Sequence, residues 1–89
     1  MIIYIGGLIS NELNISPPAG RGLIKLAIKD EFGPFINYGD ISFENFMKVI
    51  NNSLKLRFKQ LNISNPSKII EYLREKLVNS QSLLTLGAI

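Results

Sequence analysis

Residues 13–34, LNISPPAGRGLIKLAIKDEFGP, contain the signals for both ends of a helix. Ser16 is a favourable N-cap residue because its hydroxyl can accept a hydrogen bond from a first-turn amide. Pro17 suits the first helical position, and Gly33 suits the left-handed residue that follows a helix. The stretch therefore predicts a helix over residues 17–32. The apolar residues between its ends repeat at helical spacing: Leu23, Ile24, Ala27 and Ile28.

The middle of this stretch, AGRG, permits two interpretations. Gly20, Arg21 and Gly22 would form an anion site if amides at the helix start and the guanidinium faced one ligand. Alternatively, the glycines let another segment approach the helix closely. Neither G-x-x-x-x-G-K-[ST] nor G-x-G-x-x-G is present, which favours close packing. Because glycine weakens a helix, a start near Arg21 is an alternative to Pro17.

Ser42 and Glu44 predict the start of a second helix, with a cap and a favourable first-turn charge. An apolar stripe at helical spacing follows: Phe43, Met47, Ile50, Leu54, Phe58 and Leu61. Residues 54–59, LKLRFK, also alternate as a strand would, so a strand there is the competing interpretation. The continuous helix is favoured because its pattern spans more residues.

A third helix is predicted to begin at Pro66, after a cap at Asn65. Its predicted buried face is Ile70, Leu73 and Leu77, with Ile69 beside it. The tetrapeptide LNIS occurs twice, at 13–16 and 61–64, each time just before such a proline. In both places we expect an apolar pair to anchor the turn that leads into the next helix.

Residues 1–9, MIIYIGGLI, are rich in β-branched residues and predict an N-terminal strand, with SNELN at 10–14 as a polar turn. An isolated strand is not stable, so it must pair. The candidate partners are 84–89, 35–38, 54–59 or a second copy of the chain. The fold prediction is therefore α+β and predominantly α-helical, with an N-terminal strand, three helices and a possible short C-terminal strand.

The 89 residues are expected to form one domain, because 46% of them are apolar and a chain of this length supports a single core. The absence of Cys and His excludes thiol nucleophiles, disulfides and the usual neutral-pH general base. We therefore expect no enzyme, no cofactor and no metal. The carboxylates Asp30, Glu31, Asp40 and Glu44 could hold Mg²⁺ or Ca²⁺, but their spacing matches no cation loop and favours helix-terminal roles.

Charge is unevenly distributed along the chain. Residues 1–44 carry three basic and five acidic side chains, whereas residues 45–89 carry seven basic and two acidic ones. Lys48, Lys55, Arg57 and Lys59 form the candidate nucleic-acid-binding stripe. No aromatic residues interleave with them, so a solvated helix face is the competing interpretation.

These observations favour a non-enzymatic protein-binding module, as a homodimer or a small subunit of a cytoplasmic complex. The nine apolar residues at the start are too few for a membrane span and lack a preceding basic residue, so we expect neither a span nor a signal peptide. The alternative function is nucleic-acid binding through the basic stripe. The predicted protein interface is Ile3, Ile5, Leu84, Leu86 and Ile89.

Overall fold

A computed structural model gives the backbone of residues 1–85 and the side chains of residues 1–80. Its elements are the helices α1 (Ile2–Leu13), α2 (Pro17–Phe32), α3 (Phe43–Val49), α4 (Lys55–Gln60) and α5 (Pro66–Thr85), the 3₁₀ turn η1 (Tyr38–Asp40) and the π-helical segment η2 (Ile50–Leu54). Because α3, η2 and α4 follow one another without a break, they form one helix, which we call helix 43–60. Within residues 1–85 the fold is therefore four helices without a strand, and the α+β prediction is wrong.

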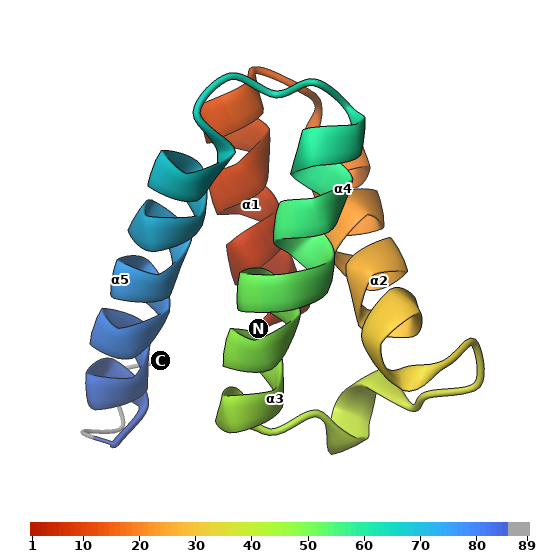
Figure 1. The fold of residues 1–89 in the computed structure, drawn as a ribbon. Coiled ribbons are helices and arrows are strands. Elements are labelled where there is room, and N and C mark those ends of the chain that lie inside the picture. Colours follow the sequence, from red (N-terminus) through yellow and green to blue (C-terminus); the bar gives the residue numbers. More distant parts are fainter. Residues whose placement is uncertain (86–89) are drawn as a thin grey trace.

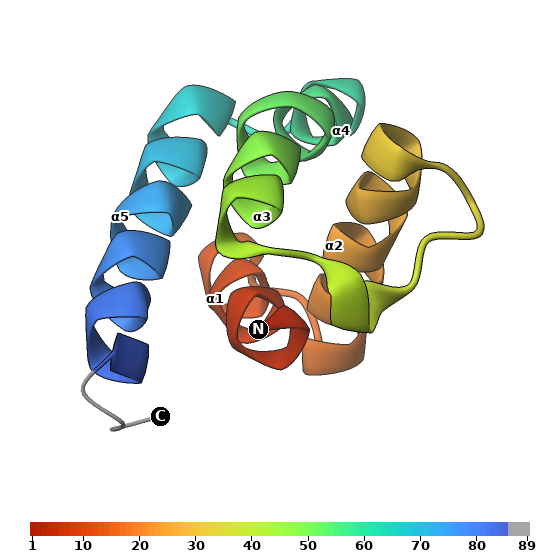
Figure 2. The same ribbon diagram turned by 90° about the horizontal axis from the view of Figure 1, so that it is seen from below.

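The four helices alternate in direction. In Figure 1, α1 and helix 43–60 run upward, whereas α2 and α5 run downward on either side of them. Each helix packs on two others: α2 contacts α1 and helix 43–60, and α5 closes the bundle against the same two. Figure 2 shows this arrangement from below, with α5 and α2 on opposite sides.

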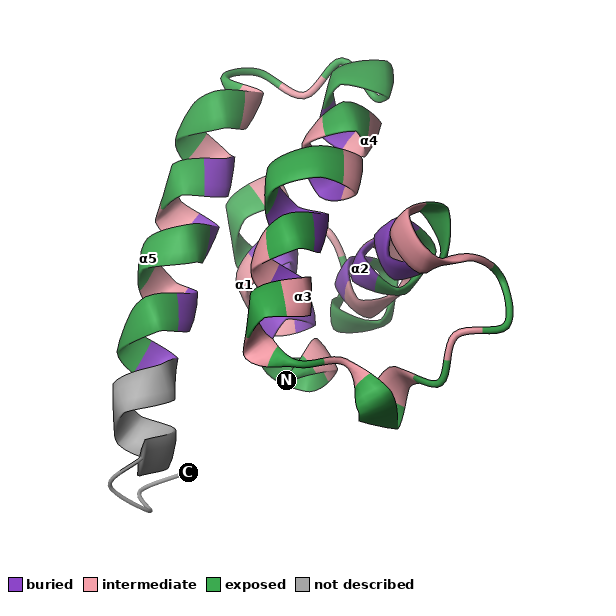
Figure 3. Ribbon diagram, turned by 60° about the horizontal axis from the view of Figure 1, so that its bottom comes forward, coloured by how far each residue is buried: buried purple, intermediate pink, exposed green. Residues whose placement is uncertain are grey.

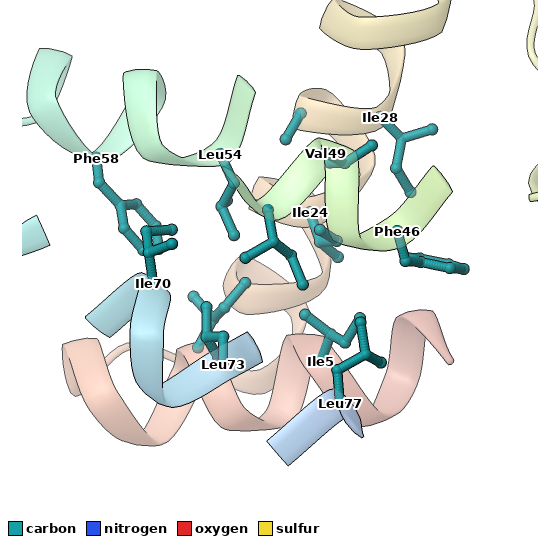
Figure 4. Close-up of a cluster of buried hydrophobic side chains, with 13 residues drawn as sticks. Ile5, Ile24, Ile28, Phe46, Val49, Leu54, Phe58, Ile70, Leu73 and Leu77 are labelled. Atoms are coloured by element: carbon teal, nitrogen blue, oxygen red, sulfur yellow. The ribbon is translucent and has the colours of Figure 1, made fainter. Parts of the chain in front are cut away.

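The core lies where the four helices face one another. Figure 3 shows the buried residues as stripes that point inward, and Figure 4 shows their side chains meeting. Every helix contributes to this cluster, so no helix is a peripheral addition. The buried hydrophobic residues are Ile5, Ile9, Ile24, Ala27, Ile28, Phe46, Val49, Ile50, Leu54, Phe58, Ile70, Leu73 and Leu77.

The N-terminal segment is the main correction to the sequence-based prediction, because residues 2–13 form α1 and not a strand and turn. Ile5 and Ile9 are buried together with Gly6 and Ser10, which is helical spacing. The β-branched residues favour strands only weakly, and burying one helical stripe outweighs that preference. Ser10, predicted to lie in a turn, is buried, and its Oγ donates to the Ile15 carbonyl oxygen at 2.5 Å.

Helix α2 is confirmed with its predicted bounds. The Ser16 hydroxyl accepts a hydrogen bond from the Ala19 amide at 3.2 Å, and Pro17 is the first helical residue. Gly33 has φ 97°, and its amide donates to the Lys29 carbonyl oxygen at 2.8 Å. The alternative start near Arg21 is therefore wrong.

Both LNIS sequences adopt the same helix-ending turn. Asn14 and Asn62 have φ of 55° and 57°, the left-handed conformation that asparagine tolerates better than most residues. In each turn the following isoleucine amide donates back across the helix end, from Ile15 to Ser10 and from Ile63 to Phe58, both at 3.0 Å. This pattern is the Schellman motif, so LNIS ends one helix besides leading into the next.

Helix 43–60 begins as predicted, since the Ser42 hydroxyl accepts from the Asn45 amide at 3.1 Å. Residues 54–59 are helical, so the strand interpretation is wrong. The buried stripe differs from the prediction, because Phe46 and Val49 are buried whereas Leu61 is exposed. The π-helical segment causes this change, because its wider turn alters the faces on which the flanking residues lie.

The start and buried face of α5 are confirmed. Pro66 is its first residue, and Ile70, Leu73 and Leu77 are buried. The helix continues to Thr85, so the C-terminal strand is wrong at residues 84 and 85, and residues 86–89 lie outside the described part. None of the helices described is long and apolar enough to cross a membrane.

The connector between α2 and α3 packs only in part. Ile36, Tyr38 and Ile41 lie against the core, and Tyr38 begins η1. Phe35 is 97% exposed, although its side chain is apolar. The turn is held by the Asn37 side chain, whose Oδ1 accepts from the Gly39 amide at 3.0 Å.

Candidate functional site

An open groove of about 430 Å³ lies between the start of α1 and the 3₁₀ turn. Figure 3 shows the start of α1 beside η1 and the start of α3. Three separate segments of the chain therefore build this surface, which we call the α1–η1 groove. Its lining residues are Met1, Ile2, Ile3, Tyr38, Gly39, Ile41 and Phe46.

The groove is apolar and has a prominent exposed residue on its wall. Ile3 is 75% exposed, and Met1 is also exposed, although both side chains are apolar. Ile2 and Phe46 lie deeper and join the groove to the core. Scattered exposed apolar residues are ordinary, but an exposed isoleucine that lines an apolar groove is typical of a contact surface.

A charged side chain of α2 lies against Tyr38, one of the lining residues. The Lys25 Nζ lies 6.0 Å from the centre of the Tyr38 ring, within reach of a cation–π interaction. Lys25 is itself exposed. A positive charge therefore lies at the edge of the groove.

A second open groove, of about 360 Å³, lies between α3 and α5. It combines the apolar Met47 and Val78 with charged and polar residues of α5, namely Glu71, Arg74, Glu75 and Asn79. Charges of both signs are mixed in its wall, so it is a less distinctive surface than the α1–η1 groove.

The predicted interface residues do not share one surface. Ile3 lines the α1–η1 groove, whereas Ile5 is 1% exposed and belongs to the core. In a strand these two residues would face the same side, but in a helix they point about 200° apart. Leu84 lies within α5, and Leu86 and Ile89 lie outside the described residues.

The predicted anion site has little support from its geometry. Gly20 is buried against Gly6 of α1, whereas Gly22 has open space beside it. The first turn of α2, residues 17–20, also offers no free amide to an anion. Pro17 and Pro18 have no N–H. The Ala19 amide donates to the Ser16 hydroxyl, and the Gly20 amide donates to the Ser16 carbonyl oxygen. Anion binding by Gly20, Arg21 and Gly22 therefore stays a prediction, and close packing explains Gly20.

The predicted nucleic-acid-binding residues lie on both sides of the π-helical segment. Lys48 and Lys59 are exposed, and Lys55 is half-buried. Arg57 forms an ion pair with Asp30, with its Nε 2.6 Å from Oδ2 and its Nη2 3.1 Å from Oδ1. Nucleic-acid binding stays a prediction, with one of its four cations already paired.

The carboxylates at the end of α2 contact helix 43–60, which the sequence did not indicate. Asp30 binds Arg57, and the Glu31 carboxylate accepts from the Ser53 hydroxyl at 2.8 Å. Both contacts join the end of α2 to helix 43–60. Asp40 lies in η1 and Glu44 in the first turn of α3. The side chains described form no cluster of three metal-ligating residues.

Sequence reasoning missed most of the groove. It placed Tyr38 and Phe46 in different elements and gave no sign that they meet beside Met1. The available signal was the apolar content of residues 35–41, which indicated that this connector packs. Comparison of the chain with family models, curated proteins and solved structures gives no match.

Proposed function

We propose that this protein is a non-enzymatic protein-binding module, which acts as a homodimer or as a small subunit of a cytoplasmic complex. The α1–η1 groove is its contact surface, and Ile3 is the anchor. The observation that carries this proposal is the 75% exposure of Ile3 on the wall of an apolar groove. Burying such a side chain yields about 1.5–3 kcal/mol, which a partner would gain.

The composition of the groove supports binding over catalysis. Its lining residues include no carboxylate, imidazole or thiol. Acid–base and nucleophilic mechanisms rely mainly on such groups. The sequence also contains no His and no Cys anywhere.

The test compares two exposed apolar residues on different faces of the molecule. Ile3→Asp places a charge on the groove wall, and Leu56→Asp places the same charge on α4, where Leu56 is 56% exposed. Both sites are exposed, so both variants should fold. An acidic residue is also favourable near the start of α1 because of the helix dipole.

We expect Ile3→Asp to abolish self-association, measured by light scattering during size exclusion, or to release the partner co-purified with the tagged native chain. Leu56→Asp should leave that association unchanged. A wild-type chain that is monomeric at high concentration and retains no partner would contradict the proposal, as would an equal effect of the two variants. Circular dichroism checks that both variants remain helical.

A further inference from the structure

One aromatic ring connects the apolar groove to a positive charge. Tyr38 lines the α1–η1 groove, and Lys25 lies over the same ring. A side chain that entered the groove would therefore bring its flanking residues close to an ammonium group. Attraction to this group would add to the burial of apolar surface.

Lys25 belongs to a basic edge of α2. Arg21, Lys25 and Lys29 are spaced four residues apart, so they lie on one side of the helix. Lys25 and Lys29 are exposed and Arg21 is half-buried. Among the side chains described, none of the three lies within ion-pair distance of a carboxylate. This basic edge therefore keeps its charge available.

The acidic residues of α2 do not neutralise this edge. Asp30 is bound to Arg57 and Glu31 to Ser53, so both carboxylates are directed toward helix 43–60. Asp40 in η1 and Glu44 in the first turn of α3 are the acidic residues nearest in sequence to the groove lining. Three cations therefore oppose two carboxylates in this region, and the local charge remains positive.

On the basis of the proposed function, we infer that the partner of the α1–η1 groove is an acidic amphipathic helix. Its apolar side chains enter the groove beside Ile3, and its carboxylates face Lys25 and the basic edge of α2. A helix fits because the groove lies between helical elements, and residues 1–85 contain no sheet edge to which an extended strand could add. The lining side chains include no cation that could contact phosphate, which a nucleic acid would need beside stacking.

The experiment uses two synthetic helical peptides of equal length that share one leucine face. The flanking positions carry Glu in one peptide and Lys in the other. Affinity is measured by fluorescence anisotropy at ~0.05 M and ~0.5 M salt, because screening weakens exposed charge pairs. Amide chemical shifts of the isotope-labelled protein locate the binding site.

We expect the acidic peptide to bind more tightly, with shifts at Ile3, Tyr38 and Ile41. High salt and Lys25→Glu should each weaken it roughly tenfold, and Lys25→Gln should weaken it less. Lys59→Glu is the matched control, since Lys59 is an exposed lysine on α4. It should change the affinity less than about twofold.

Equal binding of the two peptides, no binding of either, or shifts at the α3–α5 groove would each overturn the inference. An equal loss in Lys25→Glu and Lys59→Glu would also overturn it, because the attraction would then be nonspecific. The proposed function is judged separately, by whether Ile3→Asp disrupts the native association. It can therefore stand when the acidic partner is excluded.

Discussion

At the scale of single residues, two glycines determine how closely α1 and α2 approach. A Cβ atom on Gly6 would lie 2.9 Å from the Arg21 Cα, and one on Gly20 would overlap the carbonyl oxygen of Gly6. Both neighbours are backbone atoms, which cannot move aside as a side chain can. Gly22 lies two residues further along α2 and has no atom nearby that a Cβ would meet. Gly20 and Gly22 lie on either side of Arg21, but the close contact with α1 requires glycine only at position 20.

Alanine substitutions at Gly20 and Gly22 should have opposite effects on stability. We expect Gly20→Ala to lower the free energy of unfolding by about 1–3 kcal/mol or more, because it overpacks the helix contact. Gly22→Ala should raise it by about 0.5–1 kcal/mol, because alanine costs less backbone entropy in a helix. Urea denaturation measures both values. Changes of the same sign would show that the helices do not meet as described.

At the scale of elements, the π-helical segment sets the orientation of the second half of helix 43–60. One additional residue in a helical turn rotates the position of every later residue by about 100° about the helix axis. This shift brings Phe58 to the same side as Phe46 and Ile50, and all three are buried. Ser53 and Arg57, which contact the carboxylates of α2, lie within and just after the segment. The wider turn therefore places Phe58 in the core and also places Ser53 and Arg57 against the carboxylates of α2.

Removing one residue from this segment should leave the core intact, because the wider turn already accommodates one residue more than a regular helix would. Deletion of the exposed Asn52 restores a regular α-helix and keeps Phe58 on its buried side. Deletion of the exposed Glu75 from the regular helix α5 instead turns Leu77 about 100° away from the core. We expect the Glu75 deletion to lower the free energy of unfolding by about 2–5 kcal/mol, and the Asn52 deletion to lower it by less than about 2 kcal/mol. Equal losses of stability in urea would rule out this role for the segment.

At the scale of the whole molecule, α5 completes the bundle by covering both α1 and helix 43–60. It does so through one face, on which Leu73 and Leu77 are buried. Val78 lies beside this face, on the wall of the α3–α5 groove, and is 48% exposed. A chain of 89 residues has a small core, so each buried residue of α5 supports a large share of its stability.

Truncating a buried and an exposed side chain of α5 should therefore give very different results. We expect Leu73→Ala to lower the free energy of unfolding by about 2–5 kcal/mol, which corresponds to a fall in Tm of roughly 10 °C or more. Val78→Ala should change the free energy by less than about 0.5 kcal/mol. Thermal unfolding followed by circular dichroism compares them. Similar Tm values for both variants would mean that α5 is not docked through Leu73.

The sequence predicted best what local chemistry determines. Both ends of α2 follow from Ser16, Pro17 and Gly33, whose effects depend on near neighbours alone. The strand prediction for residues 1–9 was wrong because β-branched residues favour a strand locally and glycines weaken a helix, whereas burial against α2 and α5 decides the outcome. The spacing of Ile2, Ile5 and Ile9 already contained the helical pattern.

The groove was less predictable for a related reason. Ile3 belonged to the predicted interface, but Ile5 was assigned beside it on the basis of strand geometry. Tyr38, Ile41 and Phe46 come from segments that only the tertiary fold brings to α1. Their meeting depends on the path of the connector, for which the sequence offers no periodic signal.

The alternating direction of the helices has a consequence for how the chain reaches this fold. Successive helices pack on each other, α1 on α2 most extensively, so many contacts form between segments close in sequence. Such topologies fold on the microsecond to millisecond scale. MIIYIGGLI at residues 1–9 is uncharged and strand-prone, the composition of a segment that aggregates when exposed. We therefore expect α1 to pair with α2 early in folding, which would shield this segment before a neighbouring chain can add to it.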